Sequence, residues 1–194
     1  MANINNFLTR VLANGVQRTN RYRCLLDVGP LGLSEYGTAA SLLREGLLCR
    51  TTMTPSRTLE TTTVDLSAGY EEKYAIGTTY NDIDCTFLCP LIKGKTEVLS
   101  LFHAWQNRIQ NRGRLNEGES ADMVLTFPET YRLTQGMRLE LLSQDKDQLL
   151  PTTSFQYFNV YPLSVAGTTV DWAMQDEMME VSVTFSFTHW QQIV

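Results

Sequence analysis

Apolar and hydroxyl side chains alternate strictly over residues 181–188, near the end of the 194-residue chain. The apolar positions are Val181, Val183, Phe185 and Phe187, and the hydroxyl positions are Ser182, Thr184, Ser186 and Thr188. Successive side chains of a β-strand point to opposite faces, so this pattern predicts a strand with one buried face and one wet face. We expect the apolar set and the nearby Trp190 to lie in the core.

Further strands are predicted wherever short apolar runs are separated by Gly, Pro, Asp and Asn. Residues 22–28 and 83–89 alternate, and shorter runs occupy 123–127, 137–142 and 155–161. The chain is 43% hydrophobic, enough for one good core, so we expect a single domain over residues 1–194. The predicted class is mainly β (α+β), an antiparallel β-barrel or sandwich with a packed internal helix.

The internal helix is predicted over residues 96–111. Thr96 is a favourable N-cap residue, and Glu97 places an acidic group at the positive end of the helix dipole. The apolar positions at helical spacing are Val98, Leu101, Phe102, Trp105 and Ile109. Because they form one continuous face, we expect them to pack against a sheet as part of the core. A shorter helix is expected around residues 39–44.

The N-terminal segment, residues 1–19, carries a second amphipathic pattern, which Gly15 is placed to end. Its apolar positions at helical spacing are Ile4, Phe7, Leu8, Val11 and Leu12. The stripe is narrow and has arginines beside it, so we expect an N-terminal helix or arm that covers a surface. That surface belongs either to a neighbouring copy or to the same subunit.

Residues 51–76 are rich in threonine, too polar for a core and too β-prone for a disordered linker. We expect a long β-hairpin or stacking loop that gains order by lying on a neighbouring subunit, although packing on its own subunit is the alternative. The expected contact positions are Met53, Thr54, Pro55, Ser56, Arg57 and Leu59.

The residue types suited to catalysis form no recognisable constellation. His103 and His189 are the two histidines, and neither is paired with an acid or cysteine motif. No Gly-x-Ser-x-Gly occurs, and residues 93–96, Lys-Gly-Lys-Thr, lack the earlier glycine of a phosphate-binding loop. We expect neither enzyme activity nor a cofactor.

Four cysteines lie in strand-like stretches: Cys24, Cys49, Cys85 and Cys89. Cys85 and Cys89 are four residues apart, which on a strand separates them by about 13 Å. Two ligands of one zinc ion cannot be that distant, because Zn–S bonds are about 2.3 Å. This spacing therefore predicts no zinc site. We also expect all four thiols to stay reduced, without a disulfide, and to behave as small apolar side chains.

The charge and hydropathy of the chain narrow the classes of partner. The net charge is -5 and the pI is about 5.1, which disfavours tight binding to nucleic-acid phosphates. No apolar run reaches the roughly 18 residues of a membrane span, so no membrane insertion is expected. The first twenty residues are polar every few positions, unlike a signal peptide, and we expect the chain to stay in the cytoplasm where it is made.

Four segments, taken in order, resemble the tail tube proteins of contractile-tailed bacteriophages. Residues 7–22 match the family's opening helix and its Gly, Arg, Asn, aromatic run, and residues 49–55 match its cysteine-to-proline segment. Residues 80–87, followed by 102–106, resemble its strand-then-helix passage. The end of the chain, residues 161–190, has the family's aromatic-Pro, Val-Asp-Trp and aromatic terminus. The order and spacing of the four segments carry the resemblance.

The resemblance implies a structural virion protein, the major subunit of the phage tail tube. Six copies would join their sheets edge to edge into one continuous β-barrel ring, and rings would stack into a hollow conduit for genome delivery inside a contractile sheath. Such closure removes the open strand edges that are a liability in a monomer. The small hydroxyl set of residues 182–188 would line the lumen.

The implied partners are further copies of the chain, the tail sheath protein, a tape-measure protein, and baseplate and tail-terminator proteins. Double-stranded DNA would pass through transiently without specific binding. The implied location is the virion, after assembly in the host bacterial cytoplasm. Three alternatives stay open: the ring-forming tube of a bacterial contractile injection or type VI-like system, a baseplate tube-initiator protein, and a monomeric small-ligand-binding β-barrel.

Overall fold

The computed structural model describes residues 17–66, 69–110, 125–143, 150–168, 170 and 178–193. The expected N-terminal helix, with its apolar positions Ile4, Phe7, Leu8, Val11 and Leu12, lies outside the described residues. No helix in the described part of the chain combines the length and the apolar character that crossing a membrane requires.

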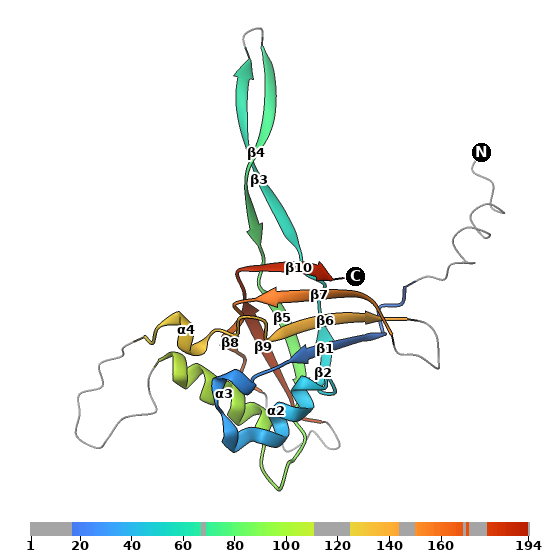
Figure 1. The fold of residues 1–194 in the computed structure, drawn as a ribbon, viewed down its shortest axis with the longest axis vertical. Coiled ribbons are helices and arrows are strands. Elements are labelled where there is room, and N and C mark those ends of the chain that lie inside the picture. The colour runs from blue at the N-terminus through green and yellow to red at the C-terminus, as the bar shows by residue number, and fades with distance from the viewer. Residues whose placement is uncertain are drawn as a thin grey trace, which may run out of the picture.

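Two four-stranded antiparallel sheets form the body of the protein (Figure 1). Sheet A has the order β1-β6-β7-β10, with strands Tyr22–Leu26, Met137–Leu142, Pro151–Phe158 and His189–Ile193. Sheet B has the order β2-β5-β9-β8, with strands Cys49–Thr52, Ile83–Leu88, Glu180–Ser186 and Tyr161–Val165. The mainly β, antiparallel prediction is confirmed, and the body takes the form of a sandwich.

Two strands cross from one sheet to the other at a shared corner. β7 leads through Asn159 into β8, and β9 leads through Thr188 into β10. Asn159 has a φ of 57°, a left-handed conformation that Asn tolerates better than most residues, and its side chain donates to Thr188 Oγ1 over 3.2 Å. The strand predicted to run through residue 188 therefore ends at Ser186, because the chain turns there to pair with β7.

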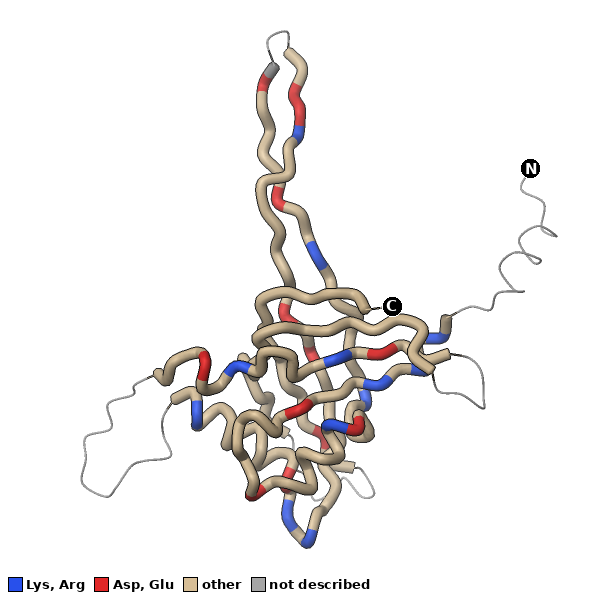
Figure 2. Tube along the Cα trace, in the orientation of Figure 1, with Lys and Arg blue, Asp and Glu red and all other residues tan. Residues whose placement is uncertain are grey.

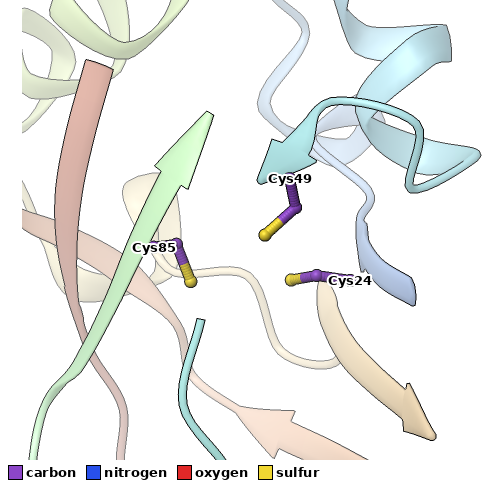
Figure 3. Close-up of side chains that lie close together, drawn as sticks. All are labelled: Cys24, Cys49 and Cys85. Carbon is purple, nitrogen blue, oxygen red and sulfur yellow. The ribbon is translucent and has the colours of Figure 1, made fainter. Parts of the chain in front are cut away.

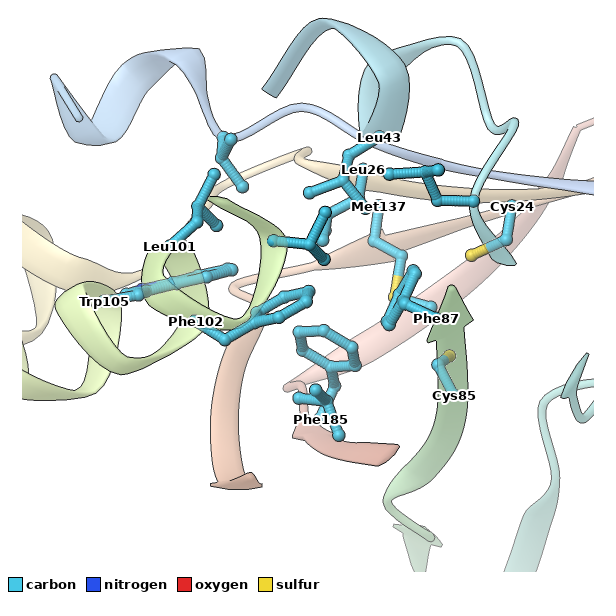
Figure 4. Close-up of a cluster of buried hydrophobic side chains, with 14 of the residues drawn as sticks. Cys24, Leu26, Leu43, Cys85, Phe87, Leu101, Phe102, Trp105, Met137 and Phe185 are labelled. Carbon is cyan, nitrogen blue, oxygen red and sulfur yellow. The ribbon is translucent and has the colours of Figure 1, made fainter. Parts of the chain in front are cut away.

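The core lies between the sheets, and α3 (Glu97–Ile109) packs against it (Figure 4). The fully buried positions of α3 are Val98, Leu101, Phe102 and Trp105. The Phe102 ring lies 5.2 Å from that of Phe87 on β5 and 6.1 Å from that of Phe185 on β9. Trp105 Nε1 donates to the carbonyl of Tyr131 over 2.8 Å, which satisfies its buried polar atom. Ile109, in the last turn, is only half-buried.

The apolar residues near the C-terminus reach the core to different depths. Val181, Val183 and Phe185 of β9 are buried, whereas Phe187 and Trp190 are half-buried and pack against the cluster. The Phe187 ring lies 5.0 Å from that of Tyr157, and the Trp190 ring lies 5.6 Å from that of Phe155. Both pairs meet edge to face, the geometry that aromatic quadrupoles favour.

Short helices cover the end of the sandwich that holds α3 (Figure 1). They are α2 (Gly37–Arg44), α4 (Pro128–Tyr131) and two 3-10 turns, η2 (Gly29–Leu31) and η3 (Ser34–Tyr36). α2 packs on β1 and α3 and buries Ala39 and Leu43. Arg108 of α3 donates to the carbonyl of Leu31, which ties this layer together.

A separate two-stranded hairpin projects from the body on the side opposite α2 and α3 (Figure 1). Its strands are β3 (Arg57–Leu66) and β4 (Tyr70–Tyr80). The hairpin expected over residues 51–76 therefore starts and ends later, because Thr51 and Thr52 pair with β5 and belong to sheet B. Among the described residues from 53 to 82, none belongs to the buried core.

Candidate functional site

The β3–β4 hairpin exposes apolar side chains along its whole length. Leu59 is 58% exposed, Ile76 67% and Tyr70 74%. The pairing register places Thr62 opposite Tyr74 and Val64 opposite Glu72. Because side chains alternate, Val64, Tyr70 and Tyr74 share one face of the ribbon near its tip. The hairpin therefore presents an apolar and aromatic surface that its own subunit does not cover.

A β-bulge interrupts the hairpin at its middle, where the register shifts between Glu60 and Thr61. Ile76 is the extra residue of β4, and a side chain on the neighbouring Gly77 would approach the Glu60 carboxylate at 3.2 Å. Thr79 donates a hydrogen bond to the same carboxylate. A bulge increases local twist, and the two strands cross at mid-length (Figure 1).

The root of the hairpin is held by the C-terminal part of the chain. The Arg57 guanidinium lies 5.6 Å from the centre of the Trp190 ring, and Tyr80 lies 6.2 Å from Phe187. Asn81 Nδ2 donates to Ser56 Oγ over 3.0 Å. A two-stranded hairpin is at best marginally stable in water. The root is therefore anchored, while the part beyond it requires a covering surface for its stability.

Charge on the hairpin is mostly negative toward its tip (Figure 2). Asp65 lies directly opposite Glu71, and Glu72 follows, with Lys73 the nearby cation. Like charges directly opposite each other destabilise a strand pair. This arrangement disfavours association of two hairpin tips with each other and favours a basic partner surface.

The sequence-predicted contact residues lie at the entry to the hairpin. Met53, Thr54, Ser56, Arg57 and Leu59 are exposed and Pro55 is half-buried. Met53 and Thr54 line a cleft of about 450 Å³ together with residues of β1 and β6. The complete lining is Gln17, Arg18, Thr19, Tyr22, Thr52, Met53, Thr54, Leu139 and Leu141. The structure thus brings the predicted contact loop next to the start of β1.

The outward face of sheet B is covered by small polar side chains. Thr184 Oγ1 donates to Asp84 Oδ1 over 2.6 Å, and the hydroxyls of Thr86 and Ser182 lie 3.2 Å apart. Of the predicted lumen-lining set, Ser182, Thr184 and Ser186 lie on β9, where Ser182 is exposed and the other two are half-buried. Thr188 is separated from them because it lies at the corner between the sheets. Arg50 and Glu180 form an ion pair at the end of the same sheet.

Each sheet has two edge strands that pair on one side only within the described part of the chain. In sheet B they are β2 and β8. β8 carries Pro162, which lacks an N–H and suits an edge position, and Leu163, which is 53% exposed. In sheet A, the edge strand β10 exposes its last three residues, 191–193. Unpaired edges of this kind are templates for pairing with another chain.

The two histidines lie apart in the structure. His103 is an exposed residue of α3, and His189 stacks on the Phe158 ring with the ring centres 4.5 Å apart. His189 belongs to β10 and contacts β7, so it serves packing at the sheet corner.

Three cysteines meet where the sheets adjoin (Figure 3). The sulfur atoms of Cys24 (β1), Cys49 (β2) and Cys85 (β5) all lie within 4.8 Å of one another. Hydrogen bonds from Cys24 and Cys85 lower the pKa of Cys49 to about 4, whereas the bond with Cys49 raises the pKa of Cys24. From the sequence we considered only Cys85 and Cys89 as ligands of one zinc ion, so this group of three was not predicted. Alternation placed Cys24 and Cys85 on inward faces, but the adjacency of β1 and β2 is not visible in the sequence.

Comparisons with known proteins identify a family and a shared fold. A family model described as phage tail tube protein matches residues 18–193. The fold is similar to a chain of an extracellular contractile injection system, the PVC sheath-tube complex in the extended state, at 10% identity and a TM-score of 0.54, covering 100% of this chain and 99% of that chain.

Two further solved structures share the fold. The tube terminating cap of the anti-feeding prophage has 12% identity and a TM-score of 0.53, with 95% of this chain and 98% of that chain covered. The PVC sheath/tube terminator in the extended state has 12% identity and a TM-score of 0.53, with 91% and 96% covered. None of the curated protein sequences matches this chain.

Proposed function

The chain belongs to the phage tail tube protein family, and on this premise we propose that six copies close into a ring and that rings stack into the hollow tube of a contractile tail. The family assigns the chain a structural role as a tube subunit. The observation that carries the proposed assembly is the hairpin of residues 57–80, which exposes apolar side chains and whose described residues add nothing to the core of their own subunit.

Ring closure is proposed to use the two edges of sheet B. β2 and β8 each pair with one strand only in the described part of the chain, so each has backbone groups free for a neighbour. Joining β8 of one copy to β2 of the next extends the same sheet around the ring. Closure leaves no unpaired edge in sheet B, so backbone groups that are exposed in the monomer become hydrogen bonds between subunits.

Stacking between rings is proposed to use the hairpin and the loop at its entry. The hairpin is long enough to leave its own ring, because ten residues of strand extend about 33 Å. It would lie on a subunit of the next ring, with Met53, Pro55 and Leu59 at the contact. The N-terminal segment, residues 1–19, is the second proposed contact, in keeping with its narrow apolar stripe.

The lumen is proposed to be lined by the outward face of sheet B. Ser182, Thr184 and Ser186 offer short hydroxyls there, and Asp84 adds negative charge. Short hydroxyls and a carboxylate do not neutralise phosphates, so double-stranded DNA stays hydrated and mobile beside them. The proposed role of the face is passage of the genome without binding.

Partners outside the tube follow from the same assembly. The structural neighbours come from a sheath-tube complex, a sheath/tube terminator and a tube terminating cap. We propose that this chain likewise contacts a sheath and a tail-terminator protein, and that baseplate and tape-measure proteins complete the tail. Its place is the virion tail, after assembly in the cytoplasm of a host bacterium.

The ring is tested with the purified full-length chain across a concentration series. Sedimentation velocity and negative-stain electron microscopy are expected to show six-subunit rings and stacked tubes at high concentration. A monomer at every concentration, even with the sheath and baseplate proteins added, would contradict the proposal.

The sheet joint is tested by a matched pair of variants. Leu163→Asp places a charge on the exposed β8 edge and is expected to prevent ring formation while the subunit stays folded. Gln191→Asp places the same charge on β10, an edge of sheet A, and is expected to leave rings intact. Loss of rings in the second variant alone would assign the joint to sheet A.

A further inference from the structure

The three cysteines at the junction of the sheets meet the geometric requirements of a metal site. Cys24 lies on β1 of sheet A, while Cys49 and Cys85 lie on β2 and β5 of sheet B (Figure 3). Their sulfur atoms all lie within 4.8 Å of one another. With metal–sulfur bonds of about 2.3 Å, three thiolates around one ion are about 4 Å apart. The sulfurs thus need to move by less than about 1 Å to share an ion.

We propose that Cys24, Cys49 and Cys85 bind one thiophilic d10 metal ion, Zn²⁺ or Cu⁺, within each subunit. Thiolate sulfur is the soft ligand that selects these ions over Mg²⁺ or Ca²⁺. In the described part of the chain the group contains no carboxylate or imidazole. An all-sulfur set of three suits trigonal Cu⁺, or Zn²⁺ with one further ligand such as water.

The surroundings of the cluster provide a route for an ion. Cys24 and Cys85 are each only 1% exposed, whereas Cys49 is half-buried. The cleft beside the entry to the hairpin is lined by Thr52 and Leu139. Thr52 Oγ1 lies 3.2 Å from Cys85 Sγ, and Leu139 is the pairing partner of Cys24. The side chains of Thr52 and Leu139 therefore lie between the cleft and the cysteine sulfur atoms.

Binding would tie together parts of the chain that hydrogen bonding within the sheets does not connect. Cys24 belongs to one sheet and the other two ligands to the second, so one ion would link the sheets at the β1–β2 junction. Cys49 also lies in β2, which leads directly to the hairpin. Only the thiolate form of each cysteine is a ligand, so protons compete with the ion and binding weakens as the pH falls.

The fourth cysteine provides an internal control. Cys89 follows β5 and is also buried, but it does not belong to the cluster. Cys89→Ser therefore removes a buried thiol without removing a proposed ligand. The inference concerns the single subunit and does not depend on tube assembly.

The test uses the full-length chain, prepared metal-free under reducing conditions, and titrated separately with Zn²⁺, Cu⁺ and Co²⁺. The wild type and Cys89→Ser are expected to retain about one ion per chain after gel filtration, measured by elemental mass spectrometry. Co²⁺ is expected to give thiolate-to-metal charge-transfer absorption, and Zn²⁺ or Cu⁺ to raise the melting temperature.

Cys24→Ser, Cys49→Ser and Cys85→Ser are each expected to lose the bound ion, the charge-transfer band and the rise in melting temperature. Cys49 is half-buried, so its variant keeps the test valid if the two buried substitutions unfold the chain. Absence of stoichiometric metal in the wild type, or equal retention by Cys49→Ser, would overturn the inference. A disulfide within the cluster in unreduced protein that binds no metal would overturn it as well.

Discussion

The sandwich body and the β3–β4 hairpin are built from similar strands but obtain stability in opposite ways. In the body, alternation buries one face of the central strands β5 and β9, and α3 adds Phe102 and Trp105 to the same core. In the hairpin, side chains on both faces are exposed, and the root contacts the body through Trp190 and Phe187. The body buries its core within one subunit. The hairpin exposes its apolar side chains, and none of its described residues belongs to that core.

The comparison distinguishes the residues that stabilise the folded subunit from those that remain available for contacts between subunits. Burial of apolar area stabilises the body by roughly 25 cal/mol per Å² removed from water. The apolar area of Leu59, Ile76 and Tyr70 is exposed, so it adds no stabilisation until another surface covers it. We infer that changes in the body will be measured as unfolding free energy and changes in the hairpin as assembly.

The largest expected effect follows removal of the hairpin. Arg57 and Tyr80 lie opposite each other, so residues 58–79 can be replaced by Asn-Gly, which favours a two-residue turn. Tube formation is expected to be abolished in negative-stain images, because the stacking surface is gone. The unfolding free energy of the body is expected to change by less than about 1 kcal/mol in urea titrations. Tubes of normal length would refute the stacking role.

A core truncation is expected to have the converse effect. Trp105→Ala removes a fully buried ring and its hydrogen bond to Tyr131, and should lower the unfolding free energy by about 3–5 kcal/mol. The matched hairpin change, Ile76→Ala, should alter it by no more than about 0.5 kcal/mol while weakening tube assembly. Denaturant titrations measure the unfolding free energy of both variants. Equal losses of unfolding free energy would contradict the distinction between the body and the hairpin.

The loop at the entry to the hairpin is expected to show a smaller, assembly-specific effect. Replacing Met53 and Pro55 with Gly removes an exposed apolar side chain and a backbone constraint, and should shorten tubes while the subunit stays folded. The control is the double change Pro90→Gly and Leu91→Gly, which alters a proline and an exposed apolar residue in a different loop. Tube lengths in micrographs should fall only in the first variant.

The smallest expected effect concerns the buried Tyr157 hydroxyl, which has no hydrogen-bond partner among the described residues. Tyr157→Phe should leave the unfolding free energy unchanged or raise it by up to about 1 kcal/mol, whereas Tyr22→Phe should lower it by about 1 kcal/mol because that hydroxyl donates to Arg50.

The pH dependence of stability gives a second test of the buried Tyr157 phenol. Burial raises the pKa of Tyr157 above its usual range. Above about pH 10 the phenol therefore ionises in the unfolded chain but stays neutral in the folded one, and the unfolding free energy falls. Denaturant titrations at pH 7 and pH 11 should therefore show less alkaline loss in Tyr157→Phe. An alkaline loss equal to that of the wild type would contradict the assignment to this phenol.

Local patterns account for most of the strands and for α3. The alternation at residues 181–186 became β9, and the helical spacing from Val98 to Trp105 became the buried face of α3. These predictions hold because side-chain period follows directly from backbone geometry. The strand end at Ser186 was missed, since alternation continues through a corner where the chain changes sheets. The bounds of the hairpin were missed for a related reason: threonine-rich strands look alike whether they belong to a sheet or project from it.

The mainly β class, the apolar face of α3 and the polar face of β9 could be predicted from the sequence, because each depends on neighbours within a few residues. The edge strands, the distance that the hairpin extends from the body, and the meeting of Cys24, Cys49 and Cys85 became clear only from the folded structure. The sulfurs come from strands separated by up to 61 positions (85 minus 24). Their proximity depends on how the two sheets pack, which no local period encodes.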